Sequence, residues 1–174
     1  MKKTLVILAH PNLNTSRMNK AWKDRLLQED TVTVHDLYTK YPDGQIDVAF
    51  EQRLLLKHER VVFQFPLYWY SSPSLLKEWQ DAVLSYGWAY GSEGTKLHGK
   101  EFMLAISTGG PEVAYQAGGF NLFSMSELTK PFQAMANLTG MRFLPTFTTY
   151  GVRTLTDDEV NKSAEDLLQH IKNA

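Results

Sequence analysis

Three short stretches of the sequence combine residue types that bind phosphate groups or planar rings. Residues 10–16 are rich in short hydrogen-bonding side chains, residues 66–73 contain three consecutive aromatic side chains, and residues 107–111 contain two adjacent glycines. Each stretch directly follows an apolar run of the kind that forms buried strands. In a parallel sheet such stretches meet at one edge, and ligands bind there, beyond the carboxyl ends of the strands.

The first stretch has two interpretations. It opens a helix, and the free N–H groups and dipole of a helix N-terminus favour a phosphate group. Asn14, Ser16 and Asn19 then form the phosphate site. His10 lies at its edge. In the alternative, Thr15 or Ser16 only caps the helix. The sequence has neither the GxxxxGK[ST] nor the GxGxxG motif, which argues against a P-loop and a classical dinucleotide site.

The other two stretches also have two interpretations each. Tyr68, Trp69 and Tyr70 are consecutive, so they cannot all face one core, and at least one is expected to face a ligand or a partner. The alternative is local packing beneath the loop. Gly109 and Gly110 lack a Cβ atom, which lets backbone N–H groups approach a ligand closely. The alternative is a tight turn that needs positive φ angles.

Taken together, the three stretches offer a phosphate site, a flat aromatic wall and bare amide donors. That set suits a mononucleotide with a large planar ring, and FMN fits it best. Other chemistry has less support. There is no cysteine, the five histidines lack metal-ligand spacing, and no GxSxG nucleophile motif occurs, so no metal site is expected. His35, His58 and His170 are expected at the surface of ordinary elements.

Composition narrows the class of protein further. With 174 residues the chain is expected to form a single domain over 1–174. A net charge of −1 gives no electrostatic reason to expect nucleic acid as a partner. The apolar run at residues 5–9 stops at a His-Pro pair and is too short for a signal peptide, and no stretch approaches the roughly 20 apolar residues of a membrane span. We therefore expect a cytoplasmic protein.

Short apolar runs alternate with helical spacing along the chain, which predicts an α/β fold with a parallel sheet. Strands are expected at 5–9, 31–35, 60–65, 100–107 and 143–150, and helices at 16–28, 47–58, 74–84, 125–138 and 156–172. Thr156 and Glu159 form a capping box for the last helix. These parts fit a flavodoxin-like three-layer sandwich with a five-stranded parallel sheet of order 2-1-3-4-5.

Residues 86–99 form one irregular insertion in this pattern. It contains Tyr86, Trp88 and Tyr90, and an exposed group of aromatics of this kind usually marks an interface. The alternative is that these side chains fold back over the sheet of their own subunit.

Three motifs in order carry a resemblance to a known family: LAHP at 8–11 with Ser16 and Asn19, FPLYWY at 65–70, and TGG at 108–110 followed by Tyr115. Over residues 3–151 the sequence resembles the flavodoxin-like NAD(P)H:quinone oxidoreductase family. Within that family it is similar to short bacterial members, which include general-stress oxidoreductases and ancillary proteins of glutathione-gated potassium efflux systems.

The resemblance implies a flavin site. The ribityl phosphate would be held by His10, Ser16, Met18 and Asn19, the ring edge by Pro66, Leu67, Tyr68, Trp69 and Tyr70, and the pyrimidine end by Ser107, Thr108, Gly109 and Gly110. FMN is expected rather than FAD, because the longer animal relatives bind FAD with extra chain.

The resemblance also implies which groups act on the flavin. Tyr115 matches the tyrosine that family members place near the N1/O2 edge. Their partner histidine is replaced here by Asn121, which can hydrogen-bond but cannot hold a proton at neutral pH. Tyr115 and the backbone amides, including that of Gly110, must then suffice. Family members are homodimers, so Tyr86, Trp88 and Tyr90 would reach the partner's substrate pocket.

The implied activity is a two-electron, ping-pong transfer of hydride from NAD(P)H through FMN to a quinone or similar aromatic acceptor. One pocket would serve donor and acceptor in turn. The alternative is a regulatory subunit that binds a potassium-efflux antiporter at the inner face of the membrane. A one-electron carrier of the flavodoxin kind would need a strongly acidic docking face, which a net charge of −1 does not supply.

Overall fold

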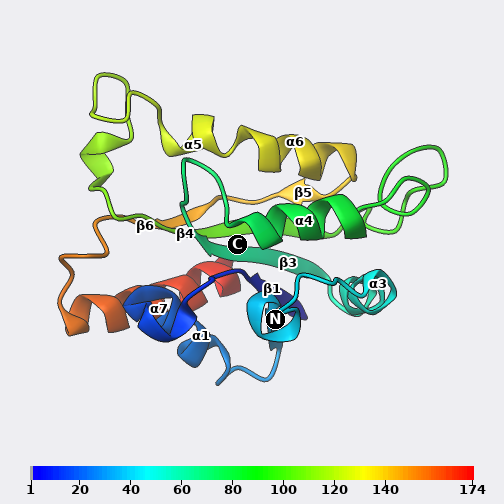
Figure 1. Cartoon of the computed structure of the whole chain (residues 1–174), viewed down its shortest axis with the longest axis horizontal. Helices are drawn as coiled ribbons and strands as arrows, with labels where there is room; N and C mark the ends of the chain where they lie inside the picture. Colours follow the sequence, from blue (N-terminus) through cyan, green and yellow to red (C-terminus); the bar gives the residue numbers. More distant parts are fainter. Residues whose placement is uncertain (1) are drawn as a thin grey trace.

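The computed structural model describes residues 2–174 and contains one parallel sheet between two layers of helices (Figure 1). The strands are β1 (Thr4–Leu8), β2 (Val32–Asp36), β3 (Arg60–Pro66), β4 (Glu101–Ser107), β5 (Arg142–Phe143) and β6 (Phe147–Thr149). The helices are α1 (Arg17–Leu26), α2 (Leu37–Lys40), α3 (Val48–Leu56), α4 (Ser74–Val83), α5 (Met125–Leu128), α6 (Lys130–Leu138) and α7 (Asp157–Asn173), with single 3₁₀ turns η1 (Leu13–Thr15) and η2 (Glu112–Ala114).

The sheet order is β2-β1-β3-β4-β5, and every pairing is parallel. This confirms the predicted flavodoxin-like fold. Helices α1 and α7 pack together on one face of the sheet, while α3, α4 and α6 cover the other. Strands β3 and β4 are buried along their whole length, as expected for strands with helices on both sides.

Two predicted elements are interrupted in the structure. The fifth strand is split into β5 and β6, which both pair with β4. Between the pairs Glu101↔Arg142 and Ala105↔Phe147, β4 advances by four residues and its partner by five. The extra residue forms a bulge around Pro145, which has no N–H to give to the ladder. The sheet therefore has six strands rather than the predicted five.

The helix predicted at 125–138 is likewise two helices. Thr129 separates α5 from α6 with φ −96° and ψ 2°, outside the regular helical range. A proline occupies the first turn of α6, where its missing N–H would have no helical partner anyway. In the middle of one continuous helix, the same proline would remove a backbone hydrogen bond. The short α2 was not predicted; Asp36 caps it by accepting a bond from the Thr39 N–H. The predicted capping box of Thr156 and Glu159 is confirmed at the start of α7.

Two apolar cores sit on opposite faces of the sheet. The Trp79 side chain on α4 is fully buried in one, against Phe63 of β3 at a ring distance of 5.5 Å. The Trp22 side chain on α1 is fully buried in the other, and its indole N–H donates to Ser163 Oγ at 3.0 Å. Each tryptophan thus ties one helical layer to the sheet or to the neighbouring helix.

His35 and His58 are not surface residues, which corrects the sequence prediction. His58 is buried and bonds Thr33 and the Leu54 carbonyl. The side chain of His35 is 10% exposed and lies 2.7 Å from Glu51, a fully buried carboxylate on α3. Helix spacing gives no sign of such partners, because they come from a neighbouring strand or helix.

The amino edge of the sheet carries a buried charge cluster. Glu101 at the start of β4 is ion-paired to Lys2, Arg60 and Arg142. Burial alone raises the pKa of Glu101, but the three cationic partners outweigh it and hold the pKa at about 2. Arg60 also donates to the backbone carbonyls of Ile171 and Ala174, which fastens the C-terminal end of the chain to this edge.

Candidate functional site

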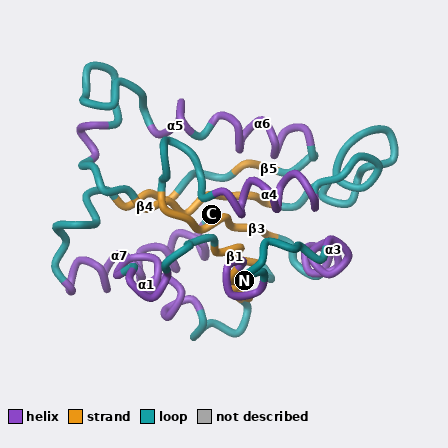
Figure 2. The backbone as a smooth tube through the Cα atoms, in the orientation of Figure 1, coloured by secondary structure: helices purple, strands orange, loops and turns teal. Residues whose placement is uncertain are grey.

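A cavity of 440 Å³ lies at the opposite, carboxyl edge of the sheet. The loops after β1, β3 and β4 all contribute to it, as the sequence predicted, and so does the loop after β6. Figure 2 draws the loops that connect the strands and helices in teal. Its lining comprises His10, Thr15, Ser16, Arg17, Met18, Asn19, Pro66, Leu67, Tyr68, Ser107, Gly109, Val152 and Arg153. Asn14 lies outside it, in a neighbouring 290 Å³ hollow next to Lys23 and Asp36.

The first loop places Ser16 at the N-cap of α1. Its Oγ accepts from the Asn19 N–H at 3.2 Å, so the capping interpretation holds for Ser16. Thr15 does not cap the helix; its hydroxyl donates to the Asn12 carbonyl at 3.0 Å. Because Ser16 both caps the helix and lines the cavity, the two interpretations of this loop are compatible.

Asn19 is buried and turned inward. Its Nδ2 donates to Ser107 Oγ at 2.9 Å, and Gln64 Nε2 donates to its backbone carbonyl at 3.0 Å. These bonds join α1 to β3 and β4 directly beneath the cavity. The Gln64 Oε1 atom is buried without a partner, an unusual state for a polar atom. The hydrogen bonds of Asn19 therefore hold the start of α1 against β3 and β4 where they line the cavity.

His10 is buried at the rim and is held in one tautomer. Its Nδ1 accepts from the Asn12 N–H at 3.1 Å, which leaves the ring proton on Nε2. Burial lowers the pKa of His10 below its usual value, and Asp36 only partly offsets this. The imidazole is consequently neutral at pH 7 and contributes a hydrogen-bond donor rather than a positive charge.

The aromatic loop is a strained two-residue turn. Tyr68 and Ser71 exchange both backbone hydrogen bonds, at 3.0 and 2.9 Å. Trp69 and Tyr70 occupy the two central positions with φ angles of 47° and 61°, where glycine or asparagine is usual. The Trp69 side chain is 93% exposed. None of these aromatics is buried beneath the loop, so local packing does not explain them, and backbone strain of this kind is common at functional sites.

Neither Gly109 nor Gly110 has a positive φ angle. A tight turn that needs positive φ therefore does not explain why glycine occupies these two positions. The reason is close packing. A Cβ atom on Gly110 would lie 3.3 Å from the Tyr115 ring, and one on Gly109 would lie 3.1 Å from Arg153 Nε. Three backbone bonds of 2.8 to 3.0 Å join this loop to residues 149–152.

Tyr115 and Asn121 lie on the loop that follows the glycines. The Tyr115 ring is half-buried against Tyr150, with ring centres 5.6 Å apart. Asn121 Oδ1 accepts from the Tyr70 hydroxyl at 3.1 Å, which links the aromatic turn to this loop. A 480 Å³ hollow opens here, lined by Gly110, Pro111, Val113, Ala114, Tyr115, Phe120 and Asn121. Gly110 and its neighbour Gly109 thus stand between this hollow and the main cavity.

Four lining residues were missed by the sequence analysis: Thr15, Arg17, Val152 and Arg153. Arg153 was detectable, because it follows the last strand at the edge where the other site loops were expected. Arg17 donates to Asp157 Oδ1 at 2.6 Å and to the Leu155 carbonyl at 3.0 Å. Over residues 2–174, Arg153 has no carboxylate partner.

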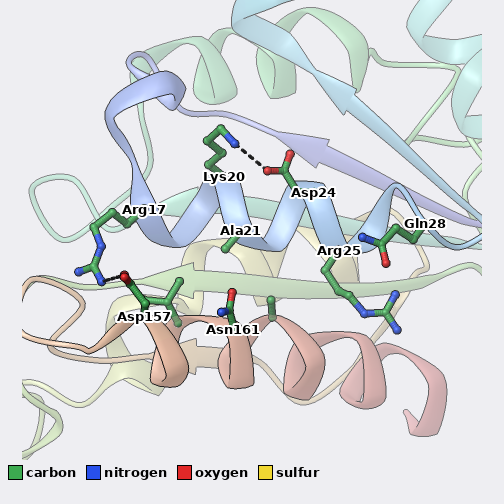
Figure 3. A pocket seen from close by; sticks show the side chains of 10 residues that line it. Arg17, Lys20, Ala21, Asp24, Arg25, Gln28, Asp157 and Asn161 are labelled. Carbon is green, nitrogen blue, oxygen red and sulfur yellow. Dashed lines mark hydrogen bonds and ion pairs between the residues drawn. The ribbon is translucent and has the colours of Figure 1, made fainter.

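A larger cavity of 560 Å³ lies between α1 and α7, but its chemistry is different (Figure 3). Its charged side chains are already ion-paired: Arg17 with Asp157 and Lys20 with Asp24 within the cavity, and Arg25 with Glu29 and Glu165 outside it. No strand-end loop with free backbone amides reaches it. Size alone therefore does not identify the site, and the carboxyl-edge cavity is the better candidate.

The insertion at residues 86–99 lies at the amino edge, on the far side of the sheet from the cavity (right in Figure 1). Trp88 and Tyr90 are half-buried against the core of their own chain, whereas Tyr86 is 71% exposed. Within one chain none of the three can reach the cavity, so any contact with a flavin would come from a second subunit.

The described residues contain no group of three His, Asp or Glu side chains that could hold a metal ion. Within residues 2–174 no helix has the length and apolar character to cross a membrane.

Comparison with known proteins gives a consistent family. A family model described as a flavodoxin-like fold matches residues 2–172. The chain is 60% identical to "Uncharacterized NAD(P)H oxidoreductase YdeQ" of Bacillus subtilis, over 98% of this chain and 87% of that protein. It is 46% identical to "Glutathione-regulated potassium-efflux system ancillary protein KefG" of Cronobacter sakazakii, over 87% of this chain and 82% of the relative.

Solved structures agree in fold. General stress protein 14 of Treponema denticola, solved in complex with FMN, superposes with a TM-score of 0.93 at 46% identity over 96% of both chains. An NADPH-quinone reductase from P. pentosaceus gives 0.90 at 37% identity over 99% of both chains. A protein named as a thermophilic tryptophan halogenase from Streptomycin violaceusniger gives 0.95 at 50% identity, over 98% of this chain and 99% of the other.

Proposed function

This chain belongs to the flavodoxin-like NAD(P)H oxidoreductase family, and we propose that it is an enzyme that uses bound FMN to pass two electrons from NAD(P)H to quinones or related acceptors. The observation that carries the proposal is the 440 Å³ cavity at the carboxyl edge, to which the three chemically distinct loops after β1, β3 and β4 all contribute. FMN, when bound, supplies the hydride chemistry; the protein supplies binding, orientation and electrostatics.

The residues present fit this cofactor. The N-terminus of α1, with the Ser16 hydroxyl, suits a phosphate group. The glycine loop leaves little room for a side chain. A Cβ atom on Gly110 would lie 3.3 Å from Tyr115, and one on Gly109 would lie 3.1 Å from Arg153. Tyr68 lines the same cavity as Gly109, and Tyr68, Trp69 and Tyr70 are 40%, 93% and 47% exposed. A ligand with a phosphate at one end and a planar ring at the other matches this layout.

Three groups are proposed to act on the ring. The hydroxyl of Tyr115 and the backbone amide of Gly110 would stabilise negative charge on the pyrimidine end of the reduced flavin. Asn121 would hold Tyr70 in position through their hydrogen bond, since its amide cannot store a proton. In this proposal donor and acceptor occupy the same open face in turn, which is a ping-pong scheme.

FMN rather than FAD is proposed because the relative from Treponema denticola was solved with FMN and matches 96% of this chain. Quinones are proposed as acceptors from the NADPH-quinone reductase similarity. The halogenase name is not adopted, because the more similar relative at 60% identity is named an oxidoreductase. Use of NAD(P)H suggests a cytoplasmic location, and a homodimer with Tyr86 at the interface remains part of the proposal.

A second candidate function is regulation of a potassium-efflux antiporter. The 46% identity to a KefG ancillary protein favours it. The two functions are compatible, since a flavoprotein can both bind a membrane partner and turn over. Co-purification with an antiporter would support the second function.

The proposal is tested by the purified protein itself. We expect a yellow protein whose heat-released cofactor migrates as FMN, and whose NAD(P)H oxidation accelerates when a quinone is added. Release of FAD alone would refute the cofactor assignment. Failure to bind any flavin after reconstitution would refute the enzyme assignment.

A further inference from the structure

The side chains proposed to hold the phosphate in the carboxyl-edge cavity carry no positive charge. A flavin phosphate carries about two negative charges near neutral pH. Of the residues assigned to it, Ser16, Met18 and Asn19 are neutral, and burial keeps His10 uncharged. The N-terminus of α1 contributes partial positive charge, and a full positive charge would have to come from another lining residue.

Only Arg17 and Arg153 are cationic among the lining residues. Arg17 already has partners, because its guanidinium donates to the Asp157 carboxylate at 2.6 Å and to the Leu155 carbonyl. In the described chain Arg153 has neither an ion pair nor a side-chain hydrogen bond. Of the two arginines that line the cavity, Arg153 is therefore the one whose guanidinium N–H groups are all free to bind a ligand.

The position of Arg153 is fixed by the backbone around it. The N–H groups of Val152 and Gly151 donate to the carbonyls of Thr108 and Gly110 at 3.0 and 2.8 Å. The guanidinium lies flat against Gly109, where a Cβ atom would approach Arg153 Nε to 3.1 Å and Cζ to 3.4 Å. A side chain at residue 109 would therefore crowd the guanidinium, which lies against this glycine.

We propose that Arg153 binds the phosphate monoester of the bound cofactor and makes the site select FMN over riboflavin, an inference that rests on the proposed function. A guanidinium presents paired N–H donors that match phosphate oxygens. The 2′-phosphate of NADPH has the same chemistry. The FMN phosphate is favoured because Arg153 shares the cavity with the Ser16 cap and the N-terminus of α1.

The test compares two flavins that differ only in the phosphate. Full-length protein freed of flavin is titrated with FMN and with riboflavin, and flavin fluorescence gives both Kd values. In R153Q we expect the Kd for FMN to rise about tenfold to a hundredfold, as for loss of a bond between charged groups, and the Kd for riboflavin to stay unchanged. R153K should fall between R153Q and the wild type, and the FMN affinity of R153Q should depend less on salt.

The matched control is R53Q. Arg53 is also an exposed arginine without an ion pair in the described chain, but it lies on α3 and lines neither cavity. Its removal changes net charge by the same amount and should leave both Kd values unchanged.

Each other outcome has a distinct meaning. An unchanged FMN Kd in R153Q, or an equal loss of both flavins, overturns the phosphate role of Arg153. A rise in the KM for NADPH but not NADH, at saturating FMN and with the FMN Kd unchanged, assigns the phosphate contact to NADPH and also overturns it. A wild-type protein that binds neither flavin refutes the proposed function itself.

Discussion

The two edges of the sheet use charge and polarity in opposite ways. At the amino edge, Glu101 is ion-paired with three cations and Arg60 also holds the C-terminal carbonyls, so the charges there are paired around a buried Glu101–Arg60 pair. At the carboxyl edge, Arg153 is unpaired, Trp69 is exposed and strained, and the Gln64 Oε1 atom has no partner. The polar groups of the amino edge are satisfied within the chain, whereas those named at the carboxyl edge are not, which is what the proposed ligand site requires.

This contrast predicts a clean separation of effects. Changes at the amino edge should alter stability without altering flavin affinity, and changes at the carboxyl edge should do the reverse. A variant that moved both properties together would break the comparison.

Glu101→Gln should have the largest effect. It removes the carboxylate that neutralises Arg60, whose side chain is 4% exposed, so the free energy of unfolding should fall by about 3 kcal/mol or more. Because the pKa of Glu101 is lowered to about 2, its stabilisation is complete above the unfolded pKa near 4.5 and is lost as the pH falls toward 2. Urea unfolding between pH 7 and 3 should therefore show a shallower acid decline in the variant. An unchanged FMN Kd is the expected control.

Gly110→Val should weaken FMN binding by about tenfold to a hundredfold, because the new side chain must displace the Tyr115 ring that lies 3.3 Å from the Cβ position. Flavin titration measures the loss. Circular dichroism and the midpoint of thermal unfolding should stay near the wild-type values, since Gly110 lacks a positive φ and its backbone tolerates a side chain. A variant that retained full flavin content would remove the glycine loop from the site.

Tyr115→Phe should slow flavin reduction by about tenfold, the cost of one neutral hydrogen bond, while the backbone amides still act on the ring. Stopped-flow absorbance at saturating NAD(P)H measures this step. Tyr150→Phe, which changes the packed neighbour at 5.6 Å but not the proposed donor, is the matched control. Equal rates in Y115F and the wild type would exclude Tyr115 from the reaction.

Trp69→Asn should have the smallest effect. Asparagine tolerates the left-handed conformation at φ 47°, so the free energy of unfolding should stay equal or rise by up to about 1 kcal/mol. The KM for a quinone should rise a few-fold, because the exposed indole wall is lost. Trp69→Phe keeps both a ring and the strain, so it should change neither quantity much. Loss of stability in W69N would contradict the assignment of strain to this turn.

The sequence was sufficient for features that depend on local pattern. The apolar runs of β3 and β4 identified buried strands, and the Thr156–Glu159 spacing identified a capping box that the structure contains. The three site loops were found because strand ends in a parallel sheet share one edge. Residue types at those ends were unusual enough to be noticed.

Features that depend on tertiary contacts were not accessible in this way. The burial of His58 follows from Thr33, a residue 25 positions away, and the bulge at Pro145 depends on the register with β4. Nor does spacing reveal that Arg17 is ion-paired with Asp157 while Arg153 has no ion pair in the described chain. For the insertion at 86–99 the sequence leaves an interface and packing over its own sheet open, and the structure shows that Trp88 and Tyr90 pack on the core while Tyr86 is exposed.

The most direct test of the account is to map FMN binding residue by residue. Titration of flavin-free, ¹⁵N-labelled protein with FMN should shift the amide resonances of Ser16, Gly109, Gly110 and Arg153. The resonances of Arg60 and Glu101 at the amino edge, and of Asn161 in the groove between α1 and α7, should not move. Shifts confined to that groove or to the amino edge, or no shifts at saturating FMN, would contradict the assignment of the carboxyl edge as the flavin site.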